Sequence, residues 1–162
     1  MFRTIAAGLV VGMLSAAAAQ AQTQQPPPAG QPAAQAQAAV NTRTFPGDAG
    51  MILNFIKPDK TADFEAVMAK LKEALQKSEK PERKQQAAGW KIFKSPDPAG
   101  ANTLYVFIID PAVKGADYSV ANILAEAFPA DQVNELYKQY AGAYAQGQNI
   151  INLNMAVDLG KQ

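Results

Sequence analysis

The sequence predicts an α+β domain with the element order β-α-β-β-α-β, a four-stranded antiparallel sheet and helices on one face. Three observations lead to this prediction. Short segments of alternating or continuous apolar residues begin near Met51, Gly89, Thr103 and Ile150. Segments with apolar residues at helical spacing lie between the first two and between the last two. Proline or glycine residues bound most of these segments.

The first half of the domain reads as strand, helix, strand. Residues 51–57 alternate and end before Pro58, which cannot donate to a strand ladder. An apolar stripe then predicts a helix that ends or kinks at Pro81. The stripe consists of Phe64, Val67, Met68, Leu71 and Leu75. Residues 89–94 alternate and form the second predicted strand.

The second half begins with residues 103–109, which are nearly all apolar and predict a strand buried on both faces. Helices are predicted over residues 118–128 and from Asp131 onward, separated by Pro129. Three tyrosines at helical spacing, interpreted as packing residues, lie along the second of these helices. They are Tyr137, Tyr140 and Tyr144. Residues 150–159 alternate and predict the fourth strand.

This order is that of the ferredoxin-like, split βαβ arrangement. Right-handed crossovers place the first and third strands side by side at the centre of the sheet. The fourth strand is then expected beside the first, and the second beside the third.

The N-terminus predicts a secretory signal peptide over residues 1–21. Arg3 supplies the positive charge, residues 5–14 form an apolar run, and Ala19-Gln20-Ala21 fits a small-residue cleavage site. The alternative is a membrane anchor, but the run is shorter than the ~20 residues that span a bilayer. We therefore expect a periplasmic or secreted protein with no membrane span after cleavage.

Residues 22–46 are rich in Gln, Ala and Pro and almost lack large apolar side chains. Such a segment buries too little surface to offset the entropy of ordering, so we expect a disordered linker. The folded domain is expected over residues 47–162.

Composition excludes several kinds of chemistry. The chain of 162 residues has no His and no Cys, which removes His-based triads, thiolate nucleophiles and the usual zinc and haem ligands. We therefore expect no metal and no cofactor. Cleavage would remove Arg3 and leave basic and acidic residues equal in number at 14, a balance that argues against nucleic-acid binding.

One short motif carries a resemblance to a known family. Residues 55–60, read FIKPDK, are followed by Asp63-Phe64-Glu65. This run resembles the strand-to-helix entry V-x-P-G-K, then E-F, of the dimeric α+β barrel superfamily, with Asp59 in place of the Gly. That superfamily includes antibiotic-biosynthesis monooxygenases. The resemblance implies a ferredoxin-like fold, a dimer, and an Asn and a Trp that contact the substrate. By element, these would be Asn54 and, more loosely, Trp90.

The third strand gives an independent argument for a homodimer. Leu104, Val106 and Ile108 face one side, while the aromatic and branched residues between them face the other. Helices on one face cover only one of these sets. The other would leave a patch of about several hundred Å² exposed, which monomers rarely do. Two sheets packed face to face remove it.

Five residues are candidate ligand contacts: Asn54, Trp90, Tyr105, Asn152 and Asn154. We expect the apolar residues Leu53 and Phe55 on the helix side, which places the three Asn side chains on the opposite face, inside the barrel. They either line a pocket or only satisfy one another. Trp90 is either a ligand contact or ordinary core.

Two functions remain open. One is non-catalytic binding of a small apolar molecule between the two subunits. The other is a cofactor-independent monooxygenase that acts on an activated aromatic substrate, oriented by Asn54 and Trp90.

Overall fold

The computed structural model describes residues 42–160, so the predicted signal peptide and all but the last five residues of the predicted linker lie outside the described residues. Four strands form one antiparallel sheet: β1 (Ala49–Ile56), β2 (Trp90–Lys94), β3 (Thr103–Ile109) and β4 (Asn149–Leu153). Their order across the sheet is β2-β3-β1-β4. The expected neighbours are therefore confirmed, and the architecture is compatible with a ferredoxin-like α+β fold.

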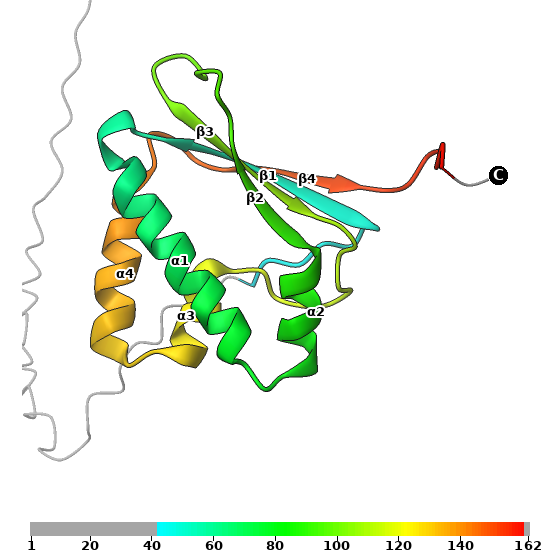
Figure 1. The fold of residues 1–162 in the computed structure, drawn as a ribbon, viewed down its shortest axis with the longest axis horizontal. Coiled ribbons are helices and arrows are strands. Elements are labelled where there is room, and N and C mark those ends of the chain that lie inside the picture. The colour runs from blue at the N-terminus through cyan, green and yellow to red at the C-terminus, as the bar shows by residue number, and fades with distance from the viewer. Residues whose placement is uncertain (1–41, 161–162) are drawn as a thin grey trace, which may run out of the picture. The chain divides into compact units, whose positions relative to one another are not determined.

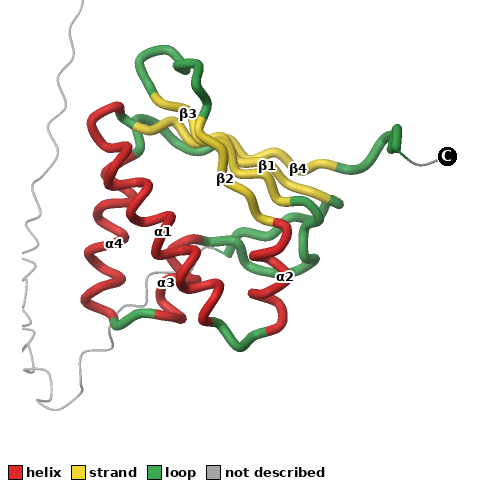
Figure 2. The backbone as a smooth tube through the Cα atoms, in the orientation of Figure 1, coloured by secondary structure: helices red, strands yellow, loops and turns green. Residues whose placement is uncertain are grey.

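The helices gather on one side of this sheet, as Figures 1 and 2 show. A 3-10 turn (Pro58–Lys60) leads into α1 (Thr61–Lys77), which is followed by α2 (Pro81–Gly89), α3 (Val120–Ala127) and α4 (Ala130–Ala143). The predicted α1 stripe is buried along its length. Over the described residues, no helix is long and apolar enough to cross a membrane.

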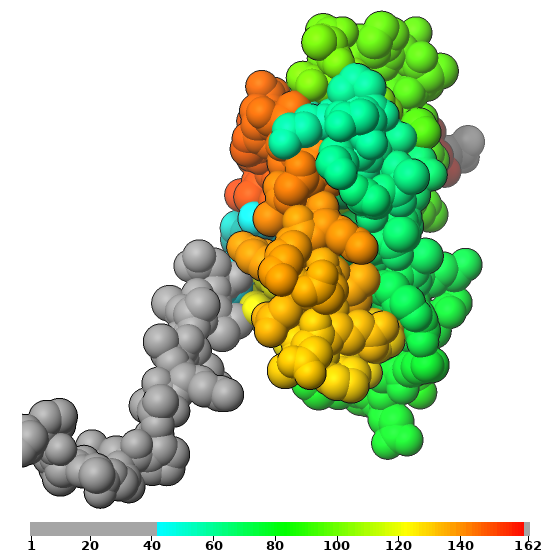
Figure 3. Space-filling model, turned by 90° about the vertical axis from the view of Figure 1, so that its left-hand side faces the viewer, coloured from blue at the N-terminus to red at the C-terminus, as the bar shows by residue number. Residues whose placement is uncertain are grey.

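The core lies between the sheet and the helices. Phe64 of α1 packs against the rings of Tyr105 and Phe107 on β3 and of Tyr140 on α4. Figure 3 shows α4 (orange) lying along α1 (teal) on this side of the molecule. The Phe64 ring of α1 thus contacts both α4 and the central strand β3, which ties the two helices to the centre of the sheet.

The side-chain alternation of β1 is opposite to the one expected. Buried and half-buried residues alternate along β1, and the buried set is Gly50, Ile52, Asn54 and Ile56. These residues face the helices, so the prediction that Leu53 and Phe55 lie on the helix side is wrong. Both faces of β1 are apolar, and the single amide among them proves to be buried rather than turned away.

The other face of the sheet, here called the open face, is covered by no described helix. Its residues are placed by the strand register, in which Met51 pairs with Ile108, Leu53 with Val106, and Phe55 with Leu104. Nine apolar side chains share this face: Met51, Leu53, Phe55, Phe93, Leu104, Val106, Ile108, Ile151 and Leu153.

The fold begins before Gly47, within the segment expected to be linker. Phe45 is fully buried and packs edge-on against Tyr118, with 5.2 Å between ring centroids. It occupies the space next to Gly50, where a Cβ atom would lie 2.3 Å from the Phe45 ring. A glycine on β1 therefore makes room for the aromatic residue that fastens the start of the domain, and the expected linker boundary is too late.

The fourth strand is shorter than predicted. It ends at Leu153, because this residue pairs with Ala49, the first residue of β1. Beyond that point β1 offers no further backbone partner.

Candidate functional site

The side chain of Asn54 lies at the centre of a buried polar cluster. Its Nδ2 donates to the carbonyl oxygens of Ile52 (3.2 Å) and Tyr105 (3.1 Å). Its Oδ1 accepts from the Tyr144 hydroxyl (2.9 Å) and from Gln148 Nε2 (2.7 Å). An amide has two donor hydrogens and two acceptor lone pairs, so all the hydrogen bonds that Asn54 can make are formed inside the chain.

The segment after α4 brings these partners to β1. The Lys57 amide donates to the Ala143 carbonyl, and the Ala145 amide donates to the Phe55 carbonyl, both at 2.9 Å. These bonds lay residues 143–145 along the end of β1. Tyr144 thereby reaches Asn54, and its hydroxyl lies 2.8 Å from that of Tyr140. Arg43 donates a hydrogen bond to Oε1 of the Gln148 side chain.

The two tyrosines act here as neutral hydrogen-bonding groups. Burial raises the pKa of both the Tyr140 and the Tyr144 hydroxyls above the ordinary value, so both keep their protons near neutral pH. A surface hollow of about 360 Å³ lies beside the cluster, lined in part by Tyr137, Tyr140 and Gln148. The donors and acceptors of Asn54 are all bonded to groups of the same chain, so the cluster contributes to the stability of the core.

The three expected Asn residues do not come together. Asn54 is buried on the helix side, whereas Asn152 and Asn154 are exposed. Asn152 is on β4 and pairs with Gly50 of β1, and Asn154 follows the end of β4. The prediction of a shared amide lining on the face away from the helices is therefore wrong.

Tyr105 is also on the helix side. Its ring is buried against Phe64, and its hydroxyl reaches the Glu65 carboxylate near the surface. Lys94 donates to the same carboxylate oxygen at 2.9 Å. These two bonds, that from Tyr105 first, hold the pKa of Glu65 below its ordinary value. Glu65 thus forms an ion pair with Lys94 and also accepts a hydrogen bond from the Tyr105 hydroxyl.

Trp90 belongs to the helix-side core. Its indole packs edge-on against Phe107 and Tyr118, at centroid distances of 5.7 and 5.4 Å. It also lines a mostly apolar cleft of about 300 Å³ between α1 and β2, together with residues such as Leu71, Leu75 and Ile92. Among buried side-chain nitrogen and oxygen atoms of the described residues, only Trp90 Nε1 has no hydrogen-bond partner.

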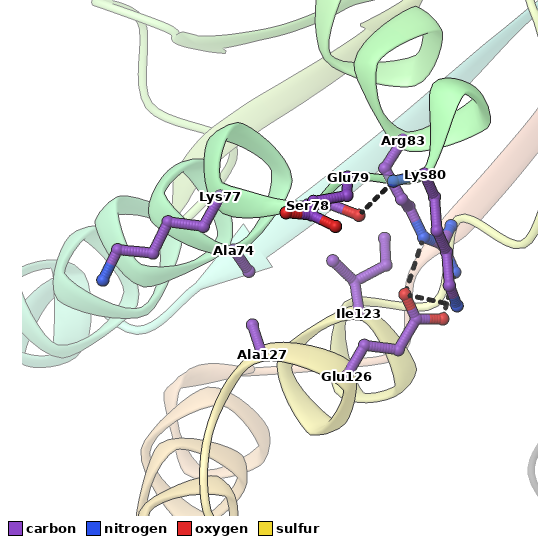
Figure 4. Close-up of a pocket in the computed structure, with 9 residues that line it drawn as sticks. All are labelled: Ala74, Lys77, Ser78, Glu79, Lys80, Arg83, Ile123, Glu126 and Ala127. Carbon is purple, nitrogen blue, oxygen red and sulfur yellow. Dashed lines mark hydrogen bonds and ion pairs between the residues drawn. The ribbon is translucent and has the colours of Figure 1, made fainter.

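A second polar cluster joins α2 to α3, as Figure 4 shows. Arg83, with 5% of its side chain exposed, donates to both carboxylate oxygens of Glu126, at 3.1 and 2.7 Å. It also donates to the Asp117 carbonyl at 2.6 Å. Lys80 adds a contact to Glu126 at 3.2 Å. The hollow beside this cluster has a volume of about 480 Å³.

The charged groups of the Arg83 cluster hold one another in their ionised forms. Arg83 holds the pKa of Glu126 below its ordinary value, and Glu126 in turn raises the pKa of Arg83, so both groups stay charged near neutral pH. Over the described residues, no group of three or more acidic side chains is placed to hold a metal ion. Neither cluster has an activated nucleophile beside a base.

The open face carries apolar side chains that no described helix covers. Its apolar residues form cross-strand rows, such as Phe93, Val106 and Leu53. Two polar residues lie at its margins: Lys91 on β2, opposite Ile108, and Asn149 on β4, opposite Leu53. None of the five residues predicted as ligand contacts lies among these rows.

Comparison with known proteins gives no match: no family model, curated protein or solved structure is significantly similar to this chain.

Sequence reasoning missed Tyr144 and Gln148 as partners of Asn54, and Tyr140 and Arg43 as the residues that bond those partners. A signal for two of them was present, because tyrosines four residues apart share one face of a helix. Their hydroxyls required a buried polar partner, and Asn54 is the buried amide of the facing strand. Nothing local indicated Gln148 or Arg43, which lie in irregular segments.

We predict that Asn54→Ala destabilises the domain by about 1–3 kcal/mol, because Tyr144, Gln148 and two backbone carbonyls lose a buried partner. Chemical denaturation of the variant beside the wild type measures this loss. Asn154→Ala is the matched control, since its side chain is exposed, and it should leave stability within about 0.5 kcal/mol. Equal stability of the two variants would contradict the structural role of Asn54.

We predict a pH-dependent loss of stability for Glu126→Gln. The carboxyl has an ordinary pKa of 4.5, and Arg83 lowers it in the folded state. The pair therefore stabilises the fold above that pH, and its contribution disappears as the pH falls through the folded-state pKa. The variant should lose about 1–2 kcal/mol at pH 7, and the difference should narrow below about pH 4.

The matched control for Glu126→Gln is Glu135→Gln, which breaks the exposed pair with Lys138. It should change stability by less than about 0.5 kcal/mol across the same pH range. Denaturation midpoints that shift equally for both variants would contradict the assignment.

Proposed function

We propose that this protein is an exported, non-catalytic binding protein that forms a homodimer through its open faces and holds a small apolar molecule between them. Export is supported by the charge, apolar run and small-residue site of residues 1–21.

The observation that carries the proposal is the apolar open face. The nine apolar residues of this face come from all four strands, and Phe93 keeps 52% of its surface exposed. Contiguous apolar surface of this kind is rare on monomers and marks sites of association. A second copy of the chain can cover this face without any other protein, because a twofold axis packs the open face of one copy on the open face of the other.

Two four-stranded sheets packed in this way supply eight strands. An eight-stranded barrel has an interior just wide enough to be filled by side chains or to hold one small ligand. The lining is apolar except at the margins, where Lys91 and Asn149 lie. The ligand that fits such a lining is a small apolar molecule. The resemblance of residues 55–65 to the dimeric α+β barrel superfamily and the ferredoxin-like strand order support the same assembly.

The monooxygenase alternative gains no support from the arrangement. It required Asn54 and Trp90 to orient a substrate inside the barrel. Both lie on the helix side, where Asn54 has no hydrogen-bonding capacity left and Trp90 packs in the core. We therefore propose binding without catalysis.

We predict that Val106→Glu yields a folded monomer, while the neighbouring change Phe107→Glu prevents folding. Val106 lies on the open face, so its carboxylate would be buried only in the dimer and should weaken association by at least about 100-fold. Phe107 is fully buried against the helices, so the same charge would enter the core. Sedimentation velocity and circular dichroism on both variants and the wild type measure the two effects.

A wild-type protein that remains monomeric at about 100 µM would contradict the proposed dimer. An interface made of two whole sheet faces is expected to have a dissociation constant below that concentration. A Val106→Glu protein that remains dimeric would show that association uses another surface.

We predict that the neutral, solvent-sensitive dye Nile red binds the wild-type dimer and that Leu53→Trp abolishes this binding. Leu53 lies in the middle of the open face, so the larger indole fills the space between the sheets. The matched control is Ile92→Trp, which enlarges a residue lining the cleft between α1 and β2. Fluorescence titration should give one dye per dimer, unchanged by Ile92→Trp.

Loss of dye binding in Ile92→Trp rather than in Leu53→Trp would move the ligand site to the cleft beside Trp90. Unchanged binding in both variants would contradict the proposal that the open faces enclose the ligand.

A further inference from the structure

The strand β2 (Trp90–Lys94) is the last strand at one side of the sheet, so only one of its edges is paired. Two bonds at the ends of its pairing with β3 show how its backbone is turned. The Gly89 carbonyl accepts from the Asp110 amide, and the Ser95 amide donates to the Leu104 carbonyl, both at 2.9 Å. Along an antiparallel strand, residues alternate between pairs that exchange hydrogen bonds and pairs that do not. The odd-numbered residues of this stretch therefore bond β3.

The even-numbered residues Ile92 and Lys94 turn their amide and carbonyl groups to the other edge, here called the β2 edge. Among the described residues, no hydrogen bond reaches these outward backbone groups. The side chains around them are exposed, including that of Ile92, which keeps 37% of its surface. A row of exposed, unpaired donors and acceptors is a template on which another extended chain can add a strand.

The β2 edge adjoins the mostly apolar cleft of about 300 Å³ between α1 and β2, here called the α1 cleft. Ile92 belongs to both, because its backbone faces the edge and its side chain lines the cleft. A strand added beside β2 would lie about 4.8 Å beyond it and would point every second side chain to the helix side. Those side chains would lie over the cleft, whose α1 lining includes Met68, Leu71 and Leu75. The cleft therefore suits an apolar side chain of an added strand.

The surroundings of the α1 cleft are positively charged, since residues 70–94 carry eight basic and three acidic side chains. Lys72 lines the cleft. Lys84 lies one turn before Ala87 on α2, and Ala87 also lines the cleft. Among the described residues, neither of these two lysines forms an ion pair, whereas four of the other lysines in this stretch do. Carboxylates on an incoming chain would give the two lysines partners.

A second copy of this chain does not complement the β2 edge. Its described sheet offers two edges, those of β2 and β4. Pairing β2 with β2 would bring together two strands with the sequence WKIFK, which has two lysines and no acidic residue. The strand β4 reads NIINL and has no charged residue. Like charges on neighbouring strands are unfavourable, and a neutral strand leaves the lysines without partners. The charge therefore favours a different chain that carries acidic residues.

We propose that the β2 edge and the α1 cleft bind an extended acidic peptide of another protein. The peptide adds a fifth strand by pairing its backbone with Ile92 and Lys94, as in the strand-addition mode of peptide recognition. One apolar side chain enters the α1 cleft, and neighbouring carboxylates lie near Lys72 and Lys84. The site uses one edge and the helix side of the sheet, so it leaves the open face to the proposed dimer.

Peptide selection supplies the probe for this site. A library of random peptides displayed on phage is selected on the immobilised wild-type protein, and a selected peptide is synthesised with a fluorescein label. We expect the selected sequences to share an apolar residue with Asp or Glu nearby. A selection that enriches no peptide, or only peptides without acidic residues, would overturn the proposal.

One substitution removes an outward amide without touching the pairing to β3. Ile92→Pro deletes the donor at the β2 edge, where proline is tolerated because the amide faces solvent. Fluorescence anisotropy with the labelled peptide should give a dissociation constant at least about tenfold weaker than that of the wild type. Ile92→Val is the matched control, since it keeps the amide and most of the side chain, and it should stay within about twofold. Equal binding by the two variants would show that the peptide does not pair with β2.

The charge of the site is tested separately with the double variant Lys72→Gln/Lys84→Gln. It should weaken peptide binding at least about tenfold and remove most of its dependence on salt concentration. The control, Lys57→Gln/Lys138→Gln, replaces two exposed lysines that do not line the cleft and should stay within about twofold of the wild type. Equal losses in the two double variants would attribute the attraction to net charge and contradict a local site.

Amide hydrogen exchange measured by NMR tests the geometry without any substitution. In the protein without peptide, the Ile92 and Lys94 amides should exchange quickly, while those of Lys91 and Phe93 should be protected by their bonds to β3. A saturating amount of the selected peptide should slow exchange at Ile92 and Lys94 at least about tenfold. Binding without this protection would overturn the proposed strand addition.

The same measurement separates this inference from the proposed dimer. Protection of the Ile92 and Lys94 amides in the wild type without peptide, lost in Val106→Glu, would show that a second copy covers the β2 edge and would overturn the peptide site. A monomeric wild type that binds the peptide with the expected protection would contradict the dimer and leave the peptide site standing.

Discussion

The helices of this domain cover only one face of the sheet. The proposed dimer and the proposed ligand site both depend on the apolar face that the helices leave uncovered. The helix side is filled by Phe64, Phe107 and Trp90, whose rings interlock between α1 and the strands. The opposite side carries an almost equally apolar set of residues with nothing from the described chain above it. A two-layer fold normally turns a polar face to water. Here both faces of the sheet are apolar and the described helices cover only one of them, which is why a second copy is proposed as the cover of the other face.

On the helix side of the sheet, Asn54 holds the segment that connects α4 to β4. Its amide takes up two strand carbonyls and leaves Oδ1 for Tyr144 and Gln148. A buried amide with unmet bonds is costly, so the cluster constrains the segment from the end of α4 to the start of β4. That segment in turn leads into β4, which pairs with β1. The polar cluster and the apolar open face are thus connected through the same strand.

The Arg83 cluster has the corresponding role at the other end of the helical layer. Arg83 binds Glu126 with two hydrogen bonds and reaches the backbone at Asp117, which joins α2, α3 and the loop before α3. Burial of a guanidinium is tolerated because almost all of its donors are satisfied. Both polar clusters therefore join separate segments of the helical layer through hydrogen bonds that are made within the chain.

The sequence by itself determined the order of the elements, the neighbours of each strand and the excess of apolar surface. Periodicity, proline positions and crossover handedness act locally or by simple topology, and the strands at residues 51–57 and 103–109 were readable for that reason. Which face of β1 meets the helices was decided only in the tertiary structure. Both faces are apolar, and polarity suggested that Asn54 points away. Its burial depends on Tyr144 and Gln148, which lie 90 and 94 residues farther along the chain. The end of β4 was decided in the same way, because a strand continues only as far as its neighbour, and β1 begins at Ala49.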